Sequence, residues 1–260
     1  MDSPIGIFDS GVGGTSIWKE IVQLMPNEHT LYLADNKHAP YGEKDKDAIV
    51  QRCINNTELL LENRCKLIVV ACNTATTNAI DYLRKSYKVP FIGIEPAIKP
   101  AALQTKTKKV GVLATKGTLA SSLFNNTAKL HASGIEVLEK EGTGLVELIE
   151  AGKTLSKETE QLLASYVNPM VDEGIDCLVL GCTHYPYLLP SLKKILPPHI
   201  KIIDSGEAVA RQTKAVLLQG NLMAATQNRG VVHRFYTNKG LDVLRGFLEG
   251  SDVTIAHLDF

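Results

Sequence analysis

The sequence predicts an α/β protein made of two similar domains, each with a mostly parallel sheet covered by helices. Short runs rich in Val, Ile and Leu alternate with longer amphipathic stretches, which is typical of parallel strands joined by helices. Several strand ends in the first half of the chain can be aligned with strand ends in the second half. The 260 residues also exceed one ordinary domain of ~100–200 residues.

The expected strands are short apolar runs of the length that buried parallel strands have. They cover residues 5–8, 30–34, 66–71, 91–94, 110–114, 135–138, 177–181 and 201–204. The clearest helical stretches have apolar residues at three- and four-residue spacing, over roughly 46–62, 75–85, 156–173 and 207–219. This order of elements supports the α/β class.

An internal repeat supports the division into two domains. Residues 5–14 align with 110–119, 68–75 with 178–185, and 91–97 with 200–208. We therefore predict a first domain of residues 1–97 plus 209–260 and a second of residues 98–208, related by a pseudo-twofold axis, with the active site in the cleft between them.

The residues after about 208 have no counterpart in the repeat. The segments 231–238 and 252–258 are expected to form a hairpin pair around a helical stretch. This tail is expected to pack on one of the domains or to extend the sheet of the first.

Composition excludes several classes of partner. Lys plus Arg and Asp plus Glu both number 28, so no overall charge favours nucleic acid or an anionic membrane. No apolar run is long enough for a membrane span, and the amino terminus does not have the pattern of an export signal. We expect a cytoplasmic protein whose 5 cysteines are thiols, with a small molecule as its substrate.

A polar cluster follows each of four expected strands. The clusters are Asp9-Ser10-Gly11, Cys72-Asn73-Thr74, Thr115 to Thr118, and Cys182-Thr183-His184. Ligands of open α/β sheets bind beyond the carboxyl ends of the strands, where loops lead into helices. The repeat places Cys72 and Cys182 at equivalent positions, so these two thiols are the leading candidates for chemistry.

Two equivalent thiols suit the inversion of a stereocentre, which needs a base on one face of a carbon and an acid on the other. A helix amino terminus after each cysteine would favour its thiolate. Backbone N–H groups and the hydroxyls of Thr74, Thr118 and Thr183 could hold a carboxylate. Asp9 and His184 could assist proton transfer.

Plainer interpretations exist for each motif. Cys53, Cys65 and Cys177 are expected to be packing residues. Asp9-Ser10-Gly11 and Pro40-Tyr41-Gly42 could each be an ordinary turn. Phosphate-loop and zinc-binding patterns are absent from the sequence, so the expected chemistry is acid–base catalysis without a metal or another cofactor.

Four motifs together resemble one known family. FDSGVGG (8–14), PYG (40–42), ACNTAT (71–76) and GCTHYP (181–186) are similar, in this order and spacing, to the aspartate/glutamate racemase superfamily. The resemblance is to its glutamate racemases and implies cofactor-independent interconversion of L- and D-glutamate. It implies that Cys72 serves the D-enantiomer and Cys182 the L-enantiomer.

The resemblance also implies roles for further residues. Asp9 and His184 match auxiliary catalytic positions, as does Glu150, for which Glu147 is the alternative register. Ser10, Asn73, Thr74, Thr118 and Thr183 match residues that hold the amino and α-carboxylate groups, and Pro40, Tyr41 and Gly42 match the loop that meets the side-chain carboxylate. The family supplies D-glutamate for bacterial peptidoglycan, which links it to cell shape, and its members are commonly dimers. Asn36 and His38 depart from the usual pattern, which has Thr and Arg there.

Other functions remain open from the sequence alone. A racemase of the same superfamily acting on aspartate or another amino acid is one alternative. A cysteine hydrolase, in which His184 activates Cys182, is another. A two-lobed module that only binds an amino acid is the third.

Overall fold

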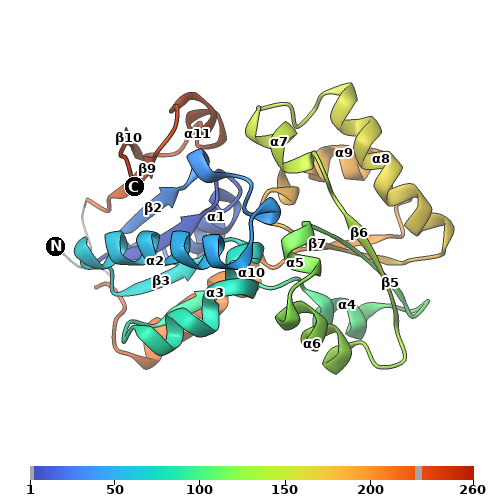
Figure 1. Cartoon of the computed structure of the whole chain (residues 1–260), viewed down its shortest axis with the longest axis horizontal. Coiled ribbons are helices and arrows are strands. Elements are labelled where there is room, and N and C mark those ends of the chain that lie inside the picture. Colours follow the sequence, from blue (N-terminus) through green and yellow to red (C-terminus); the bar gives the residue numbers. More distant parts are fainter. Residues whose placement is uncertain (1–2, 226–229) are drawn as a thin grey trace. The chain divides into compact units, whose positions relative to one another are not determined.

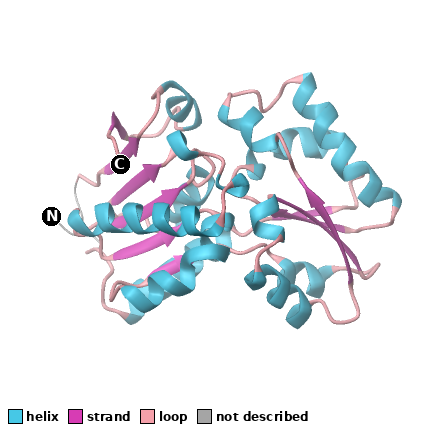
Figure 2. Ribbon diagram, viewed as in Figure 1, coloured by secondary structure: helices cyan, strands magenta, loops and turns pink. Residues whose placement is uncertain are grey.

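The computed structural model describes residues 3–225 and 230–260 and divides into two compact units. The first contains residues 1–94 and 206–260, and the second contains residues 95–205. Figure 2 shows strands flanked by helices in each unit. The prediction of an α/β fold with mostly parallel sheets is confirmed, because every strand pair in the described residues is parallel.

The first unit is built on a sheet whose order is β10-β9-β2-β1-β3-β4. Its strands are β1 (Ile5–Asp9), β2 (Thr30–Ala34), β3 (Leu67–Val70), β4 (Phe91–Gly93), β9 (His233–Thr237) and β10 (Thr254–His257). Its helices are α1 (Thr15–Leu24), η1 (Asn36–His38), η2 (Tyr41–Glu43), α2 (Lys46–Glu62), α3 (Asn73–Ser86), α10 (Gly206–Gln219) and α11 (Asp242–Phe247). Strands β1, β2 and β3 are buried along their whole length, as their apolar sequences predict.

Helices cover both faces of this sheet (Figure 1). On the α2 face, a side chain at Gly6 would meet Leu60 and Cys65 at about van der Waals distance or closer, so glycine allows the helix to approach the central strand. On the other face, the ring of Trp18 from α1 meets the ring of Phe235 on β9 edge to face at 4.9 Å. Both contacts fix the central strands, whose ends carry the polar motifs.

The tail corrects one prediction. β9 and β10 are neighbours, but they run parallel rather than forming a hairpin, with Phe235 opposite Ile255. The physical reason is that α11 connects them, and a strand–helix–strand connection returns the chain in the same direction. β9 also pairs with β2, so the tail extends the sheet of the first unit.

The second unit has a sheet in the order β6-β5-β7-β8. Its strands are β5 (Lys109–Ala114), β6 (Glu136–Glu141), β7 (Cys177–Gly181) and β8 (Lys201–Ile203). Its helices are α4 (Ile98–Gln104), α5 (Lys116–Leu119), α6 (Ser122–His131), α7 (Leu145–Glu150), α8 (Lys157–Asp172), η3 (Tyr185–Leu188) and α9 (Leu189–Ile195).

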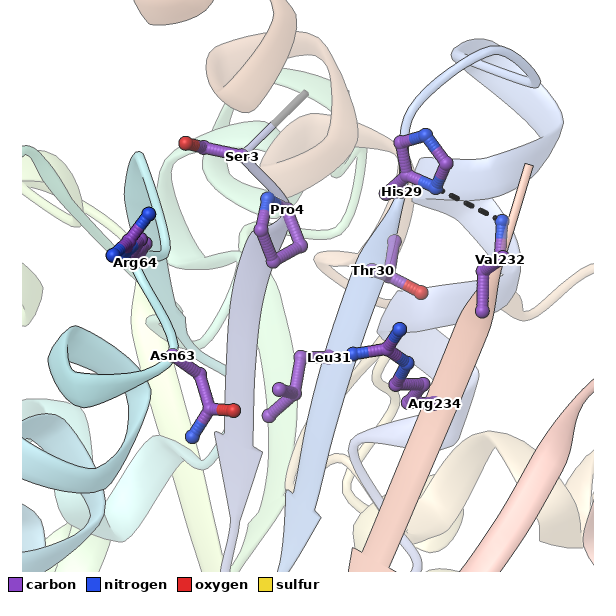
Figure 3. A pocket seen from close by; sticks show the side chains of 9 residues that line it. All are labelled: Ser3, Pro4, His29, Thr30, Leu31, Asn63, Arg64, Val232 and Arg234. Atoms are coloured by element: carbon purple, nitrogen blue, oxygen red, sulfur yellow. Dashed lines mark hydrogen bonds between the residues drawn. The ribbon is translucent and has the colours of Figure 1, made fainter. Parts of the chain in front are cut away.

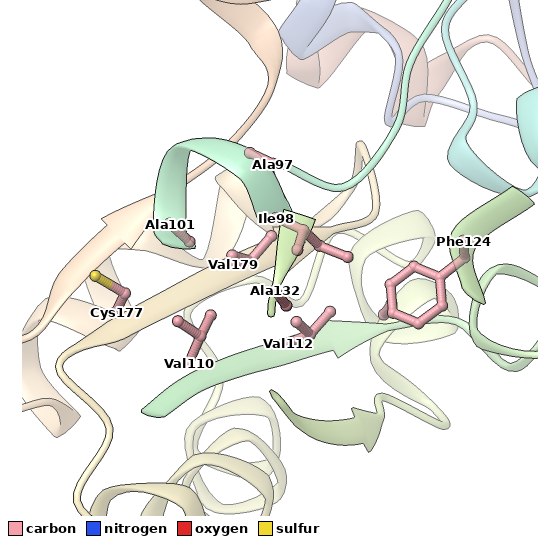
Figure 4. Packing of buried hydrophobic residues seen from close by; sticks show 10 residues of the cluster. Ala97, Ile98, Ala101, Val110, Val112, Phe124, Ala132, Cys177 and Val179 are labelled. Atoms are coloured by element: carbon pink, nitrogen blue, oxygen red, sulfur yellow. The ribbon is translucent and has the colours of Figure 1, made fainter. Parts of the chain in front are cut away.

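Alternate residues of the central strands face opposite helices in this unit. Val110, Val112 and Val179 belong to a buried cluster with Ile98 of α4 and Phe124 of α6 (Figure 4). A side chain at Gly111, by contrast, would meet Ile175 and Met170 on the α8 side. This alternation is what a strand buried on both faces requires.

The two units share one strand order. β2-β1-β3-β4 in the first corresponds to β6-β5-β7-β8 in the second. In each, the chain leaves the central strand toward one side and returns on the other, which makes a switch point between β1 and β3 and between β5 and β7. Polar motifs follow all four of these strands.

Two remaining observations concern the membrane and the chain start. In residues 3–225 and 230–260, the structure has no helix with the length and apolar character needed to cross a bilayer. Met1 and Asp2 belong to the amino-terminal segment that lacks the pattern of an export signal. They lie outside the described residues.

Candidate active site

The first polar cluster lies at the switch point between β1 and β3. The carboxylate of Asp9 accepts the backbone N–H groups of Gly11 and Gly14 at 3.1 and 3.0 Å, which holds the loop after β1 in a tight curve. The hydroxyl of Ser10 lies 3.8 Å from the Cys72 sulfur. Asp9 is fully buried and Cys72 is 5% exposed. The predicted residues of these two motifs are therefore brought together.

Cys72 occupies the cap position of α3. Its sulfur accepts the backbone N–H of Ala75 at 3.5 Å, so the thiol lies at the positive end of the helix dipole. A helix amino terminus favours the thiolate over the thiol. The expectation of a helix after this cysteine is confirmed.

Asn73 follows at the first turn of α3 and is only 3% exposed. Neither its amide oxygen nor its amide nitrogen has a hydrogen-bond partner in the structure. Burying an amide without hydrogen-bond partners costs free energy, and such a group often marks a place where a ligand binds. Thr74, its neighbour, is equally buried at 3%.

Asp35, at the carboxyl end of β2, holds the loop that contains Pro40, Tyr41 and Gly42 in place. The Tyr41 hydroxyl donates to Asp35 Oδ2 at 2.5 Å, and Arg52 Nε donates to the same oxygen at 2.8 Å. Burial, followed by the charge of Asp35, raises the pKa of Tyr41 well above its usual value. The phenol of Tyr41 thus stays protonated at neutral pH, and its hydroxyl is bonded to Asp35 within the protein.

Asp35 is a functional candidate that the sequence analysis missed. Its other oxygen accepts Asn238 Nδ2 at 2.6 Å and lies 2.7 Å from His38 Nδ1. The available signal was its position directly after a buried strand, the same position that singled out Asp9 after β1. Asn36 and His38, the departures from the family pattern, both bond within this region, since Asn36 accepts the Thr237 hydroxyl at 3.0 Å.

The second polar cluster lies at the switch point between β5 and β7. His184 Nδ1 is 3.7 Å from the Cys182 sulfur, and His184 Nε2 is 2.7 Å from Glu150 Oε1. A carboxylate that accepts the Nε2 proton leaves Nδ1 of the neutral ring as an acceptor facing the thiol. The three side chains form a line along which a proton on sulfur can be accepted and returned.

The acidic residue of α7 (Leu145–Glu150) that makes this contact is Glu150, and Glu147 lies one helical turn earlier. Glu150 reaches the histidine and has a side chain that is 17% exposed. Thr118 and Thr183 lie at the same strand ends and are 0% and 2% exposed. The Thr118 hydroxyl is 3.0 Å from that of Thr115.

One expectation for this cluster is wrong. The chain after Cys182 does not enter an α-helix directly, because the single-turn 3₁₀ helix η3 comes first. Pro186 lies in the first turn of η3, where its missing N–H costs no helix hydrogen bond, and η3 leads directly into α9. Cys182 thus does not cap an α-helix as Cys72 does, and its sulfur lies 3.7 Å from His184 Nδ1.

The three other cysteines have the properties of packing residues. Burial raises the pKa of Cys65 to about 12 and that of Cys177 to about 11, and burial also raises the pKa of Cys53. These thiols stay protonated at neutral pH. Among the residues described, no group of three His, Cys, Asp or Glu side chains could hold a metal ion.

Comparisons with known proteins agree with this arrangement. The model of the Asp/Glu/Hydantoin racemase family matches residues 5–213. The chain belongs to this family. A glutamate racemase of Ectopseudomonas mendocina is 50% identical over 223 residues, covering 85% of each chain.

Solved racemases share the fold along the whole chain. Glutamate racemase RacE1 of Bacillus anthracis matches with a TM-score of 0.87 at 30% identity, covering 99% of this chain and 98% of that one. Escherichia coli glutamate racemase, solved with L-glutamate, matches with a TM-score of 0.86 at 34% identity and the same coverage. The racemase family therefore accounts for both units, including the tail on the first sheet.

Proposed function

We propose that this chain is a glutamate racemase, an isomerase that interconverts L- and D-glutamate with Cys72 and Cys182 as its base and acid. The observation that carries the proposal is the equivalent position of the two thiols, each after the same strand of two sheets with the same order. Curated relatives that are 45% and 50% identical to this chain are glutamate racemases. They favour glutamate over aspartate as the substrate.

The reaction is a balanced exchange of one proton. The thiolate of Cys72 removes the α-proton of D-glutamate, leaving a planar carbanion whose charge spreads into the α-carboxylate. The thiol of Cys182 then gives its proton to the opposite face, which yields L-glutamate. The reverse reaction begins with Cys182 as thiolate, so the two cysteines exchange protonation states in each turnover.

Neighbouring groups assist each thiol. His184 accepts a proton from Cys182 and returns it, and Glu150 holds the ring in the required orientation. Asp9 shapes the loop that carries Ser10 to Cys72 and assists proton transfer on that side. The donors at the amino end of α3 stabilise the Cys72 thiolate.

The remaining polar residues hold the substrate. Asn73, Thr74, Thr118 and Thr183, with Ser10, bind the amino and α-carboxylate groups, and Pro40, Tyr41 and Gly42 meet the side-chain carboxylate. The buried amide of Asn73 supports this assignment, since neither its oxygen nor its nitrogen has a hydrogen-bond partner among the described residues. Solved relatives hold L-glutamate in the Escherichia coli protein and D-glutamate in the Francisella tularensis protein.

The biological role extends this proposal. D-glutamate made by the chain would serve peptidoglycan synthesis, and the enzyme would act in the cytoplasm as a homodimer, without a metal or organic cofactor. A size measurement by light scattering tests the dimer. A monomer at all working concentrations would contradict it.

Exchange of the α-proton with solvent tests the reaction. The purified chain in D₂O, without pyridoxal phosphate or added metal, should place deuterium at the α-carbon of either glutamate enantiomer. Aspartate should exchange far more slowly. If neither glutamate enantiomer takes up deuterium, the assignment fails.

The line from Cys182 through His184 to Glu150 also suits a cysteine hydrolase, which is the second candidate. A hydrolase attacks a carbonyl and forms an acyl-thioester on Cys182. Mass spectrometry of the chain quenched during turnover detects such an adduct. Glutamate racemisation predicts an unmodified mass, and the position of Cys72 has no role in hydrolysis.

A further inference from the structure

A cavity lies in the first unit, at the end of the sheet opposite the polar motifs. It has a volume of about 290 Å³ and is lined by residues from the amino ends of β1, β2 and β9 and the end of α2 (Figure 3). These are Ser3, Pro4, His29, Thr30, Leu31, Asn63, Arg64, Val232 and Arg234. Strand β1 separates this end from Asp9 by its whole length, roughly 15 Å at ~3.3 Å per residue. The cavity is therefore not part of the candidate active site.

The described lining carries positive charge. Arg64 and Arg234 both line the cavity, and among the described residues no Asp or Glu does. Within residues 3–225 and 230–260, neither guanidinium forms an ion pair, whereas Arg52, Arg211 and Arg245 each pair with a carboxylate. Figure 3 shows Arg64 on the α2 side of the cavity and Arg234 on the β9 side.

The position of Arg64 points to a role for its side chain. It follows the cap residue of α2 and has a φ of 58°, in the left-handed region where glycine is preferred. A side chain there costs about 1 kcal/mol relative to glycine. Arginine at this turn thus has a conformational cost that helix termination alone does not require.

The rest of the lining is held in place by hydrogen bonds. His29 Nδ1 accepts the backbone N–H of Val232 at 3.0 Å, so the neutral ring carries its proton on Nε2. The Thr30 hydroxyl accepts Trp18 Nε1 at 2.9 Å and lies 2.9 Å from His233 Nδ1. The wall at His29, Thr30 and Val232 is therefore formed before any ligand arrives, whereas the exposed side chains of Arg64 and Arg234 become ordered when the ligand binds.

We propose that this cavity is a second ligand site, separate from the glutamate site, for a small organic dianion. Guanidinium groups bind phosphate and carboxylate groups through paired N–H donors, and two arginines match a charge of minus two. The volume is at the lower end of small-molecule pockets, so the ligand is a compact one. A phosphate ester and a polycarboxylate share this chemistry, and the test separates them.

The test is calorimetric titration of the full chain, at pH 8 and constant ionic strength, with glycerol 3-phosphate in one arm and succinate in the other, because each of these carries two negative charges at this pH. At least one probe should bind at one site per chain. Arg64→Gln and Arg234→Gln should each weaken that binding about tenfold or more, because each removes a charged hydrogen-bonding partner. Which arm binds tells phosphate from carboxylate recognition.

Arg211→Gln is the matched control, since Arg211 is an exposed arginine of the same unit that does not line the cavity. It should bind the probe as the unchanged chain does. The emission spectrum of Trp18, the single tryptophan, verifies that each variant is folded. Absence of saturable binding in both arms, or equal binding by the unchanged chain and both cavity variants, would overturn the proposal.

Discussion

Asn73 shows how a single residue can be favourable for function and unfavourable for stability. Its amide is 3% exposed, and neither of its polar atoms has a partner. The folded protein therefore carries the desolvation cost of the amide without a compensating hydrogen bond. In a glutamate site, the substrate supplies the missing partner.

Replacing Asn73 with alanine should raise the KM for glutamate about tenfold or more, because substrate loses its hydrogen bonds to the amide. The free energy of unfolding should stay the same or rise by up to ~1 kcal/mol, since no protein hydrogen bond is lost. Steady-state kinetics and urea unfolding measure the two effects.

Asn78→Ala on the same helix is the matched control. Its amide donates to the Thr74 carbonyl at 2.9 Å, so its loss should reduce stability with little change in KM. An Asn73→Ala variant that unfolds more easily and keeps its KM would contradict this account.

Glu150→Gln should lower kcat/KM by about 10–100-fold, because the carboxylate no longer stabilises the charge that His184 gains from Cys182. The loss must be equal in both directions, since the equilibrium constant between enantiomers is one. Circular dichroism of glutamate follows each direction. Glu147→Gln, three residues earlier on α7, should stay near the unchanged rate, and equal losses in both variants would refute the role of Glu150.

At the scale of elements, one buried carboxylate connects the loop before α2 to distant parts of the first unit. Asp35 accepts hydrogen bonds from Tyr41, Arg52 and Asn238, which lie on η2, on α2 and after β9. Arg52 also donates to the main-chain oxygen of Phe260 at 2.9 Å. The position of the loop thus depends on the tail of the chain.

Asp35→Asn should lower the free energy of unfolding by about 2 kcal/mol or more, because the partly buried guanidinium of Arg52 loses its charged partner inside the protein. Chemical denaturation measures this loss. Asp45→Asn is the control, since asparagine caps α2 as well as aspartate does. A change in Asp35→Asn no larger than in the control would contradict the account.

The carboxylate of Asp176, in the second unit, should make the free energy of unfolding depend on pH. Burial raises the pKa of Asp176, but hydrogen bonds from Thr105 and from the N–H groups of Lys106 and Thr107 outweigh it and lower the pKa to about 2. A depressed pKa means that the stabilisation is complete above the unfolded pKa of about 4 and is lost as the pH falls toward 2.

The stability difference between the unchanged chain and Asp176→Asn should therefore shrink as the pH is lowered from 5 to 2. Urea midpoints at each pH measure it. A difference that stays constant or grows over this interval would contradict the assignment, because it would show that the carboxylate is not held ionised by these bonds.

At the scale of the whole molecule, local sequence patterns predict the strands and their order better than they predict contacts between residues far apart in the sequence. The expected strands all appear, although β6 and β8 are partly exposed rather than buried, and the order of β1, β3 and β4 reappears in β5, β7 and β8 as the repeat implies. The direction of β10 was predicted wrongly, because short alternating runs do not encode whether neighbouring strands are parallel. The place of Asp35 after β2 is a local signal, but its bond to Asn238, 203 residues away, is a long-range contact that local pattern does not predict.

The central claim is that two thiols, one from each unit, share a single reaction. The most direct measurement is kcat/KM in both directions for Cys72→Ser and Cys182→Ser, with Cys177→Ser as the matched control. Each of the first two should lose roughly 10³-fold or more, since serine is a far weaker acid and base partner, while the control keeps its rate. A Cys72→Ser or Cys182→Ser variant that racemises glutamate at the unchanged rate would contradict the account.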